Sequence, residues 1–381
     1  MGKPTCEPAH RLRDGSLLQL LFESDHSRRS PRTRDIGMTI TVYYATNRNE
    51  TGTDASPSFG PNFHQKGPQY LRFGSAEVEP PTTPGGDYRV VSVRLAPEQV
   101  VTPGTPQLLG SRQIFDELRT RMKAQAADLI LLIHGYSCDF TTALQRVAQV
   151  KQEYQQAGRP VEAAVFSWPA DGELIPFISY YSDRDDAKAS GPAIARAFLK
   201  LLDYFRDIGP DQYCWQHLHL VAHSMGNYAL RNALQAIIAQ YPGNTLPRVF
   251  QNIFLMAADE DNDALELDYK MARLPELAQA VQVYYAATDG ALSISDETKG
   301  NPDRLGSTGP RTLTNLPHKI TLVDCRKVNE TSPLTDLGHQ YYRKRPEVIA
   351  DVRQVLAGLT PDEIANRDYI PEKRAYRIRS F

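Results

Sequence analysis

The stretch LHLVAHSMGNYAL, residues 218–230, decides the fold class, because it joins a strand to a helix through a short turn. The run LHLVA is apolar throughout, which indicates a strand covered on both faces. Apolar residues then recur over 230–238 at the spacing of an amphipathic helix. Between the two, Ala222–Gly226 is a variant of G-x-S-x-G with Ala in the first Gly position. Small residues on both sides permit a tight turn that exposes the hydroxyl of Ser224.

Strand-like and helix-like segments alternate along most of the chain. Strands are expected at 39–45, 88–95, 129–133, 162–168, 218–222, 252–257, 281–286 and 320–323. Helices are expected over 111–122 with Ser111 as N-cap, and over 140–154, 194–205, 230–238 and 346–356. This repetition predicts the α/β class, with a mostly parallel sheet flanked by helices and an N-terminal antiparallel strand extension.

The predicted organisation has one large domain. Residues 1–37 lack periodicity and contain the basic run RRSPRTRD, so we interpret them as a disordered N-terminal arm. The alternative is an arm that binds an anionic partner. Residues 38–381 are expected to form a single domain with N-terminal strands and a loop (38–110), a catalytic core (111–358) and a C-terminal tail (359–381).

Composition narrows the classes of partner. Lys plus Arg total 43 and Asp plus Glu total 45, a formal charge of −2, whereas a nucleic-acid-binding domain is usually basic. The 4 Cys are far apart, so neither a zinc ribbon nor a disulfide framework is expected. No apolar run is long enough to span a membrane, and the start lacks a secretory signal. We therefore expect a cytoplasmic protein that binds no nucleic acid and has no membrane span.

Ser224 requires a general base, because a serine hydroxyl is a poor nucleophile on its own. Two histidines follow it in the chain. His318 lies just before the strand at 320–323, which places it at the wrong end of the sheet, because ligands bind outside the carboxyl ends of parallel strands. His339 lies beyond that strand, in the loop before the last helix. We predict that His339 is the base; the alternative is an ordinary surface histidine.

The base in turn requires an orienting acid. Asp289 directly follows the strand at 281–286, and Asp259 and Asp261 follow the strand before it. An acid after the penultimate strand fits the chain order Ser, Asp, His of hydrolases. We therefore predict Asp289, with Asp259 or Asp261 as the alternative acid. Alternatively, each of these aspartates only stabilises a turn by hydrogen-bonding its backbone.

An oxyanion formed at Ser224 would need two convergent backbone N–H donors. The residue after the serine, Met225, and the loop after the strand at 129–133 are placed to supply them, which makes Tyr136 the second candidate. His134, Trp168 and His223 flank these loops, and we predict that they contact the substrate.

Two longer segments could shape the substrate pocket. The loop 290–318 is rich in Gly, Pro, Ser and Thr, and it separates the candidate acid from the candidate base. The segment 172–183 carries several aromatic and aliphatic residues. It is predicted either to wall an acyl pocket or to pack into the core as a helix.

Several motifs together resemble a bacterial family of α/β-hydrolases of unknown function that is related to esterases and lipases. Between Thr41 and the last helix they are YYATNR (43–48), GSAEVEPP (74–81), VVSVRL, HGY, VFSWP, SDRDDAKAS, VAHSMGN, ATDGALSIS and GHQYY. The resemblance implies an α/β-hydrolase fold with Ser224 as nucleophile, Asp289 as acid and His339 as base. It also implies Tyr136 and Met225 as oxyanion donors, and it implies no particular substrate.

The function predicted from the sequence is therefore that of a serine hydrolase. It would cleave a carboxylic ester or related acyl bond of a small-molecule substrate through an acyl-enzyme, with no cofactor and no metal. One alternative is a thioesterase or amidase with the same residues. Another is a non-catalytic binding protein on the same scaffold, since a fold does not determine a function. The sequence predicts no oligomeric state.

Overall fold

Strands and helices alternate in a computed structural model that describes residues 39–83, 85–97, 109–170, 178–292, 303–329 and 337–381. The strands are β1 (Ile40–Thr46), β2 (Arg48–Glu50), β3 (Phe59–Phe63), β4 (Arg72–Glu79), β5 (Arg89–Leu95), β6 (Asp128–Ile133), β7 (Val161–Ser167), β8 (Leu218–His223), β9 (Phe250–Met256), β10 (Ala278–Tyr285), β11 (Ile320–Asp324), β12 (Arg367–Ile370) and β13 (Ala375–Ile378). The helices are α1 (Gly110–Gln125), α2 (Phe140–Tyr154), α3 (Ile178–Asp207), α4 (Gly226–Gln240), α6 (Leu305–Thr308), α7 (Arg326–Asn329), α8 (Tyr341–Lys344) and α9 (Pro346–Leu356), with 3₁₀ turns η1 (Pro210–Gln212), η2 (Leu274–Leu277) and η4 (Pro371–Lys373).

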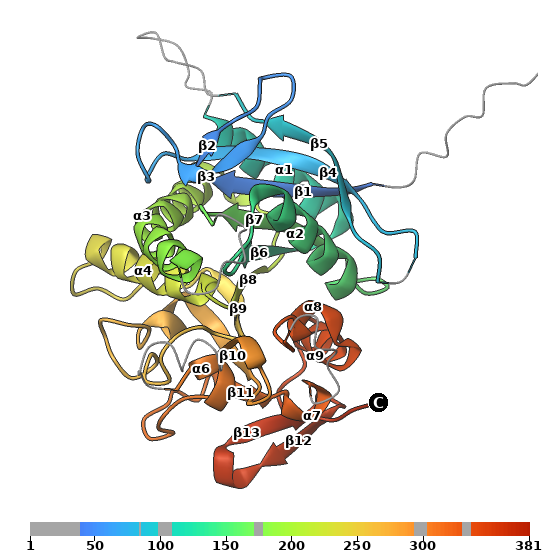
Figure 1. Ribbon diagram of the computed structural model, residues 1–381, viewed down its shortest axis with the longest axis vertical. Helices are drawn as coiled ribbons and strands as arrows, with labels where there is room; N and C mark the ends of the chain where they lie inside the picture. The colour runs from blue at the N-terminus through green and yellow to red at the C-terminus, as the bar shows by residue number, and fades with distance from the viewer. Residues whose placement is uncertain (1–38, 84, 98–108, 171–177, 293–302, 330–336) are drawn as a thin grey trace, which may run out of the picture. The chain divides into compact units, whose positions relative to one another are not determined.

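Among the described residues, 11 strands form one sheet in the order β12-β13-β11-β10-β9-β8-β6-β7-β1-β4-β5 (Figure 1). All neighbouring pairs from β13 to β1 in that order are parallel. β4 and β5 at one edge, and β12 at the other, are antiparallel. The predicted mostly parallel sheet with an N-terminal antiparallel extension is confirmed.

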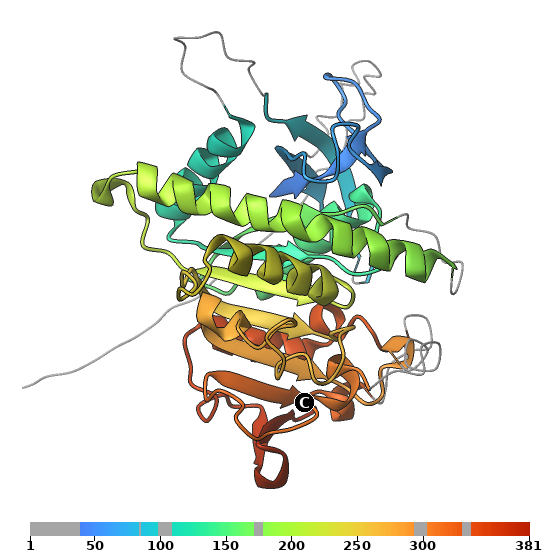
Figure 2. The same cartoon turned by 90° about the vertical axis from the view of Figure 1, so that its left-hand side faces the viewer.

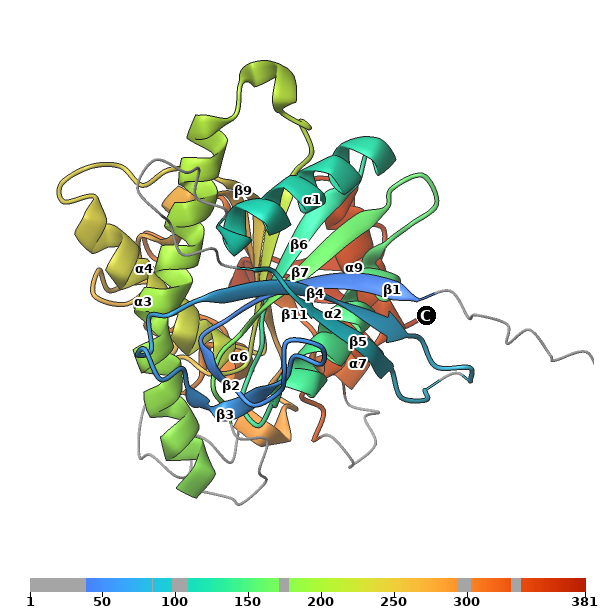
Figure 3. The same ribbon diagram turned by 90° about the horizontal axis from the view of Figure 1, so that it is seen from above.

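Helices cover both faces of this sheet, which explains why the inner strands are apolar throughout. α1, α3 and α4 pack on one face, and Figure 2 shows α3 and α4 running side by side across it. α2, α8 and α9 pack on the other face, where Figure 3 shows α2 and α9. The core therefore consists of two apolar layers, one on each side of the sheet.

The order of the strands reverses between β6 and β8. From β6 the chain moves to β7 on one side, and it then returns through α3 to β8 on the other side. In open parallel sheets such a switch point leaves a crevice outside the carboxyl ends of the two strands, and ligands bind there. The carboxyl ends of β6 and β8 lead directly to His134 and Ser224.

The strands and helices expected from the sequence are present, with differences at their ends. The prediction of Ser111 as N-cap is wrong: α1 begins at Gly110, Leu109 takes the N-cap position, and Ser111 is buried inside the helix. α3 begins at Ile178 rather than near 194. The sequence did not predict its first half because that part is polar and shows little apolar periodicity. β2, β3, β4 and the tail strands β12 and β13 were not expected.

The predicted arm, residues 1–37, lies outside the described residues. Within the part of the chain that the structure describes, no helix is both long and apolar enough to cross a membrane.

Candidate active site

Ser224 occupies a strained turn between β8 and α4. Its φ is 54°, in the left-handed region that a non-glycine residue rarely adopts, and such strain persists only where neighbours enforce it. Its N–H donates to the Met256 carbonyl at 3.0 Å, and its own carbonyl accepts from the Asp259 N–H at 3.2 Å. The buried Asn227 side chain donates to the carbonyls of Ser224 and Ala222, each at 3.0 Å. These bonds hold the turn from both sides.

Two glycines allow the turn to press against the loop after β6. A Cβ on Gly226 would lie 2.5 Å from the Ile133 carbonyl oxygen, and a Cβ on Gly135 would lie 2.7 Å from the Cβ of Ser224. Neither contact is tolerated by real side chains, so both positions require glycine. The start of α4 and the His-Gly-Tyr loop are therefore in direct contact beside Ser224.

Asp289 and His339 meet at the carboxyl ends of β10 and β11. The Nδ1–H of His339 donates to Asp289 Oδ2 at 2.8 Å. The other carboxylate oxygen, Oδ1, accepts from the backbone N–H groups of Ala291 and Leu292. The two loops are also joined through the backbone, because Gly290 N–H donates to the Leu337 carbonyl at 2.9 Å. Asp289 is fully buried, and its orientation is fixed by these bonds.

The electrostatic surroundings favour the protonated form of His339. Burial lowers the pKa of its imidazole, but the charge and hydrogen bond of Asp289 outweigh burial, and Asp259 adds to them. The pKa of His339 is therefore raised above the ordinary value for histidine. With Nδ1–H bound to Asp289, the lone pair of the neutral ring is on Nε2, the atom that a general base uses.

His223 connects the turn to the loop that carries His339. Its Nε2–H donates to the His339 carbonyl at 3.0 Å, and its ring lies 4.7 Å from the His339 ring and stacks on Tyr342. Burial, followed by the nearby His339, lowers the pKa of His223 well below its ordinary value, so the ring stays neutral. His223 is 1% exposed. We predicted that it contacts substrate, but this geometry instead suits it to position His339.

His134 and Trp168 bind each other behind the loop after β6. The Trp168 backbone N–H donates to His134 Nε2 at 3.2 Å, and the Trp168 indole N–H donates to the His134 carbonyl at 2.9 Å. Their rings stack at 5.0 Å, and they are 1% and 0% exposed. We predicted them as substrate contacts, but the structure buries both side chains and uses their polar atoms internally. They brace the loop that presents Tyr136.

Arg48 reinforces the same region and was missed as a site residue. Its guanidinium is fully buried and donates to the carbonyls of Cys138, Ala170 and Gly60 and to Ser167 Oγ. These acceptors belong to β3, to the last residue of β7 and to the loops that follow β6 and β7. Burial lowers the pKa of Arg48 to about 10, so it remains charged near neutral pH. The one sequence signal was the motif YYATNR, which ends at this residue.

Replacing Arg48 by Met should destabilise the protein by about 3 kcal/mol or more, because several buried acceptors lose their donor and each orphan costs about 1–3 kcal/mol. The free energy of unfolding in urea measures this effect. Arg89→Met is the matched control, since Arg89 pairs with Glu79 at an exposed position and its loss should cost at most about 1 kcal/mol. Equal losses for both variants would contradict the assigned role of Arg48.

A buried charge network borders the turn on the β9 side. Tyr180 Oη donates to Asp259 Oδ2 at 2.6 Å, and the fully buried Arg304 lies 3.4 Å from Asp259 Oδ1 and 2.6 Å from Asp261 Oδ1. Asp259 and Asp261 are thus committed to Tyr180 and Arg304, whereas Asp289 holds the His339 ring. This arrangement favours Asp289 as the acid. Arg304 comes from the long loop 290–318, whose residues 293–302 lie outside the described residues.

The carboxyl group of Glu260, in the same network, has a raised pKa. It is fully buried, and burial raises its pKa to about 7 despite the nearby Arg231 and Arg184. Arg231 Nη1 lies 3.3 Å from Glu260 Oε2.

No group of three or more His, Cys, Asp or Glu among the described side chains is arranged to hold a metal ion. His318 is exposed at the amino end of β11, away from the turn.

Comparison with known proteins gives two findings. The sequence model of a family described as "Alpha/beta hydrolase of unknown function (DUF900)" matches residues 112–358. A curated protein of Nostoc sp., "Uncharacterized protein alr1448", is 35% identical over 75 residues, which are 20% of this chain. The matched segment is only 17% of that relative's length, so the similarity concerns a small part of both proteins.

Proposed function

Because the chain belongs to the α/β-hydrolases of unknown function, we propose that it is a serine hydrolase in which Ser224, His339 and Asp289 form the catalytic triad. The observation that carries the proposal is the 2.8 Å hydrogen bond from His339 Nδ1–H to Asp289 Oδ2. It is supported by the positive φ of Ser224 at the end of β8. These groups follow the carboxyl ends of β8, β10 and β11, which lie on the same side of the parallel sheet.

The proposed reaction is acyl transfer in two steps. His339 Nε2 accepts the proton of Ser224 as its Oγ attacks a substrate carbonyl, and Asp289 stabilises the resulting imidazolium. The backbone N–H groups of Met225 and Tyr136 bind the oxyanion, and one such donor is typically worth about 2.7–4 kcal/mol of barrier. The proton then passes to the leaving group. Water, activated by the same histidine, hydrolyses the acyl-enzyme.

The strained turn supports catalysis over the non-catalytic binding alternative. A positive φ at a non-glycine residue costs of order 1–3 kcal/mol, and its usual benefit is exposure of a nucleophile at the start of a helix. A pure binding protein would gain stability from glycine at this position. The same geometry serves esters, thioesters and amides, so a carboxylic ester remains our first candidate substrate and the other two follow it.

A fluorescent fluorophosphonate tests the proposed function directly. We expect it to label the full-length wild-type protein, with the adduct on the peptide that contains Ser224, and to label His339→Ala far more slowly. Matched ester, thioester and amide substrates then rank the leaving groups. Absence of labelling under conditions where a known serine hydrolase reacts would refute the triad and favour the binding protein.

The pH profile provides an independent prediction. Activity requires neutral His339, so kcat/KM should fall as the pH drops through the pKa of this residue in the free enzyme. Because Asp289 raises that pKa, the acid limb should lie above the ordinary histidine value of about 6.5. Asp289→Asn should move the limb to lower pH, since the raising charge is lost. A limb that stays in place in this variant would argue that another group titrates.

A further inference from the structure

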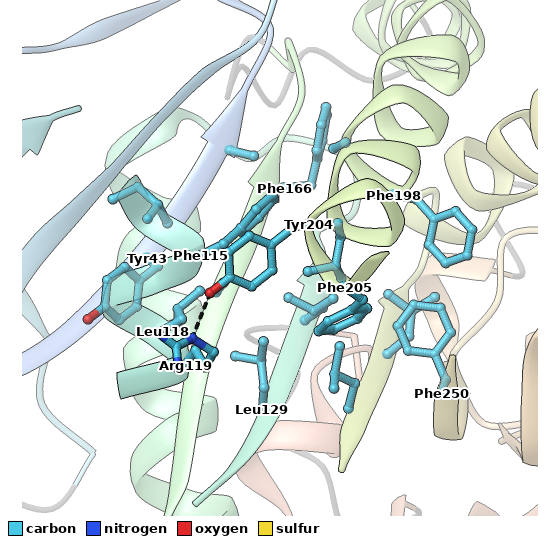
Figure 4. A pocket seen from close by; sticks show the side chains of 18 of the residues that line it. Tyr43, Phe115, Leu118, Arg119, Leu129, Phe166, Phe198, Tyr204, Phe205 and Phe250 are labelled. Carbon is cyan, nitrogen blue, oxygen red and sulfur yellow. Dashed lines mark hydrogen bonds between the residues drawn. The ribbon is translucent and has the colours of Figure 1, made fainter. Parts of the chain in front are cut away.

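An apolar cavity of about 350 Å³ lies between the sheet and helices α1, α3 and α4 (Figure 4). Protein interiors normally leave few voids larger than a water molecule, and a larger void lowers stability. The exposure of Leu131 indicates that the cavity reaches the sheet. This leucine lies midway along the inner strand β6 and lines the cavity, yet it is only partly buried. A feature this large in a natural core calls for an occupant.

Two polar side chains at the cavity wall, Arg119 and Tyr204, are already paired. Arg119 Nε donates to Tyr204 Oη at 2.8 Å, as Figure 4 shows, and its Nη1 donates to the Gln212 carbonyl at 3.0 Å. Tyr204 Oη in turn donates to Asp116 Oδ1 at 2.7 Å. The remaining wall is almost wholly aliphatic and aromatic. An occupant therefore gains little from placing a charge inside the cavity.

The cavity is wide but thin. Its lining comes from six adjacent strands, represented by Phe73 (β4), Tyr43 (β1), Phe166 (β7), Leu131 (β6), Leu220 (β8) and Phe250 (β9). Five gaps between neighbouring strands correspond to roughly 24 Å. A volume of about 350 Å³ distributed over that width suits an extended chain better than a compact ring system.

An exposed aromatic residue marks the side of the cavity that faces solvent. Trp215 lines the cavity, is 77% exposed and has a φ of 61°. Its ring meets the Tyr213 ring at 5.6 Å. A large apolar side chain held outward by a strained backbone gives a hydrocarbon a surface to contact as it enters.

This entrance is distinct from the proposed catalytic site. Leu218, the first residue of β8, lines the cavity near Trp215, whereas Ser224 follows the last residue of the same strand. Ser224, Asp289 and His339 do not belong to the cavity lining.

We propose that the cavity binds one long alkyl chain, with the polar end of the ligand left at Trp215, at a site separate from Ser224. A neutral alcohol and a carboxylate with such a chain present the same hydrocarbon to the wall, so both are expected to bind. This inference does not depend on the proposed hydrolase activity.

Displacement of a fluorescent fatty-acid probe, 11-(dansylamino)undecanoate, from the full-length protein tests the proposal. We expect 1-dodecanol and dodecanoate to displace it and 1-butanol to fail. Ala197→Phe, on the α3 wall, should weaken probe binding at least about tenfold, because the added ring fills the cavity. Ala189→Phe is the control, since Ala189 lies on the same helix outside the lining and is also partly buried. The control should leave binding unchanged.

Thermal melting keeps the test decisive if Ala197→Phe folds poorly. 1-Dodecanol should raise the melting temperature of the wild type, because a ligand that binds only the native state stabilises it. No displaceable probe binding in the wild type, or unchanged binding in a folded Ala197→Phe, would overturn the proposal. Loss of binding in protein already labelled by fluorophosphonate would also overturn it, because the cavity would then belong to the catalytic site. Failure of labelling alone leaves the alkyl-chain site standing.

Discussion

Ser224→Ala should lower the turnover of an acyl substrate by about 10⁶-fold, the size of effect that follows loss of the nucleophile in a serine triad. Alanine removes the attacking oxygen but keeps a Cβ in the same small space beside Gly135. Because the backbone bonds to Met256, Asp259 and Asn227 remain, the turn should keep its geometry. The melting temperature should therefore change little. Single-turnover rates measured together with thermal unfolding separate the two effects.

Ser75→Ala is the control for this prediction. Ser75 is also buried, but it lies on β4, where its hydroxyl accepts a hydrogen bond from Arg94. Its loss should leave turnover within a fewfold of the wild type. Residual activity of Ser224→Ala close to the wild-type level would mean that another group is the nucleophile.

Asp289→Asn should reduce kcat by about 10⁴-fold, as expected when the acid of such a triad becomes an amide. An amide N–H at the position of Oδ2 cannot accept from His339 Nδ1–H. The ring would then adopt the other tautomer, which lacks a lone pair on Nε2. Steady-state kinetics on one good ester substrate provide the measurement.

Asp259→Asn is the matched comparison, because Asp259 is an equally buried aspartate at the end of the neighbouring strand. Its side chain accepts from Tyr180 and faces Arg304, so its influence on His339 is through charge alone. A loss of about tenfold is expected, of the order of a single nearby charge. A larger loss in Asp259→Asn than in Asp289→Asn would transfer the role of acid to Asp259.

The local features of this site were predictable because they depend on neighbours in the sequence. The turn at Ser224 follows from an apolar strand, two small residues and an amphipathic helix, all within 218–240. Asp289 and His339 were selected by their positions after strands, and the parallel order of β10 and β11 brings them together. The alternation of strands and helices therefore predicted that residues far apart in the sequence, such as Asp289 and His339, lie close together.

The supporting residues were not predictable in the same way. Arg48 contacts acceptors 12, 90 and 122 residues away, and no periodic pattern reports such distances. The burial of Trp168 and His134 depends on a bond between the ends of two strands. β12 is short and its two middle residues are exposed, so it offers neither an apolar run nor a clear alternation. These features follow from tertiary contacts rather than local preference.

The outer strands have a consequence for how the protein is divided in experiments. The family match ends at residue 358, but β13 pairs with β11 beyond that point, and Arg367 on β12 forms a buried ion pair with Asp351 on α9. At the other edge, β1 pairs with β7 from outside the matched region. A fragment cut to the matched residues would leave β7 and β11 as unpaired edge strands and would leave the buried Asp351 without its cation, so it should aggregate. The unit recognised by homology is smaller than the unit that folds.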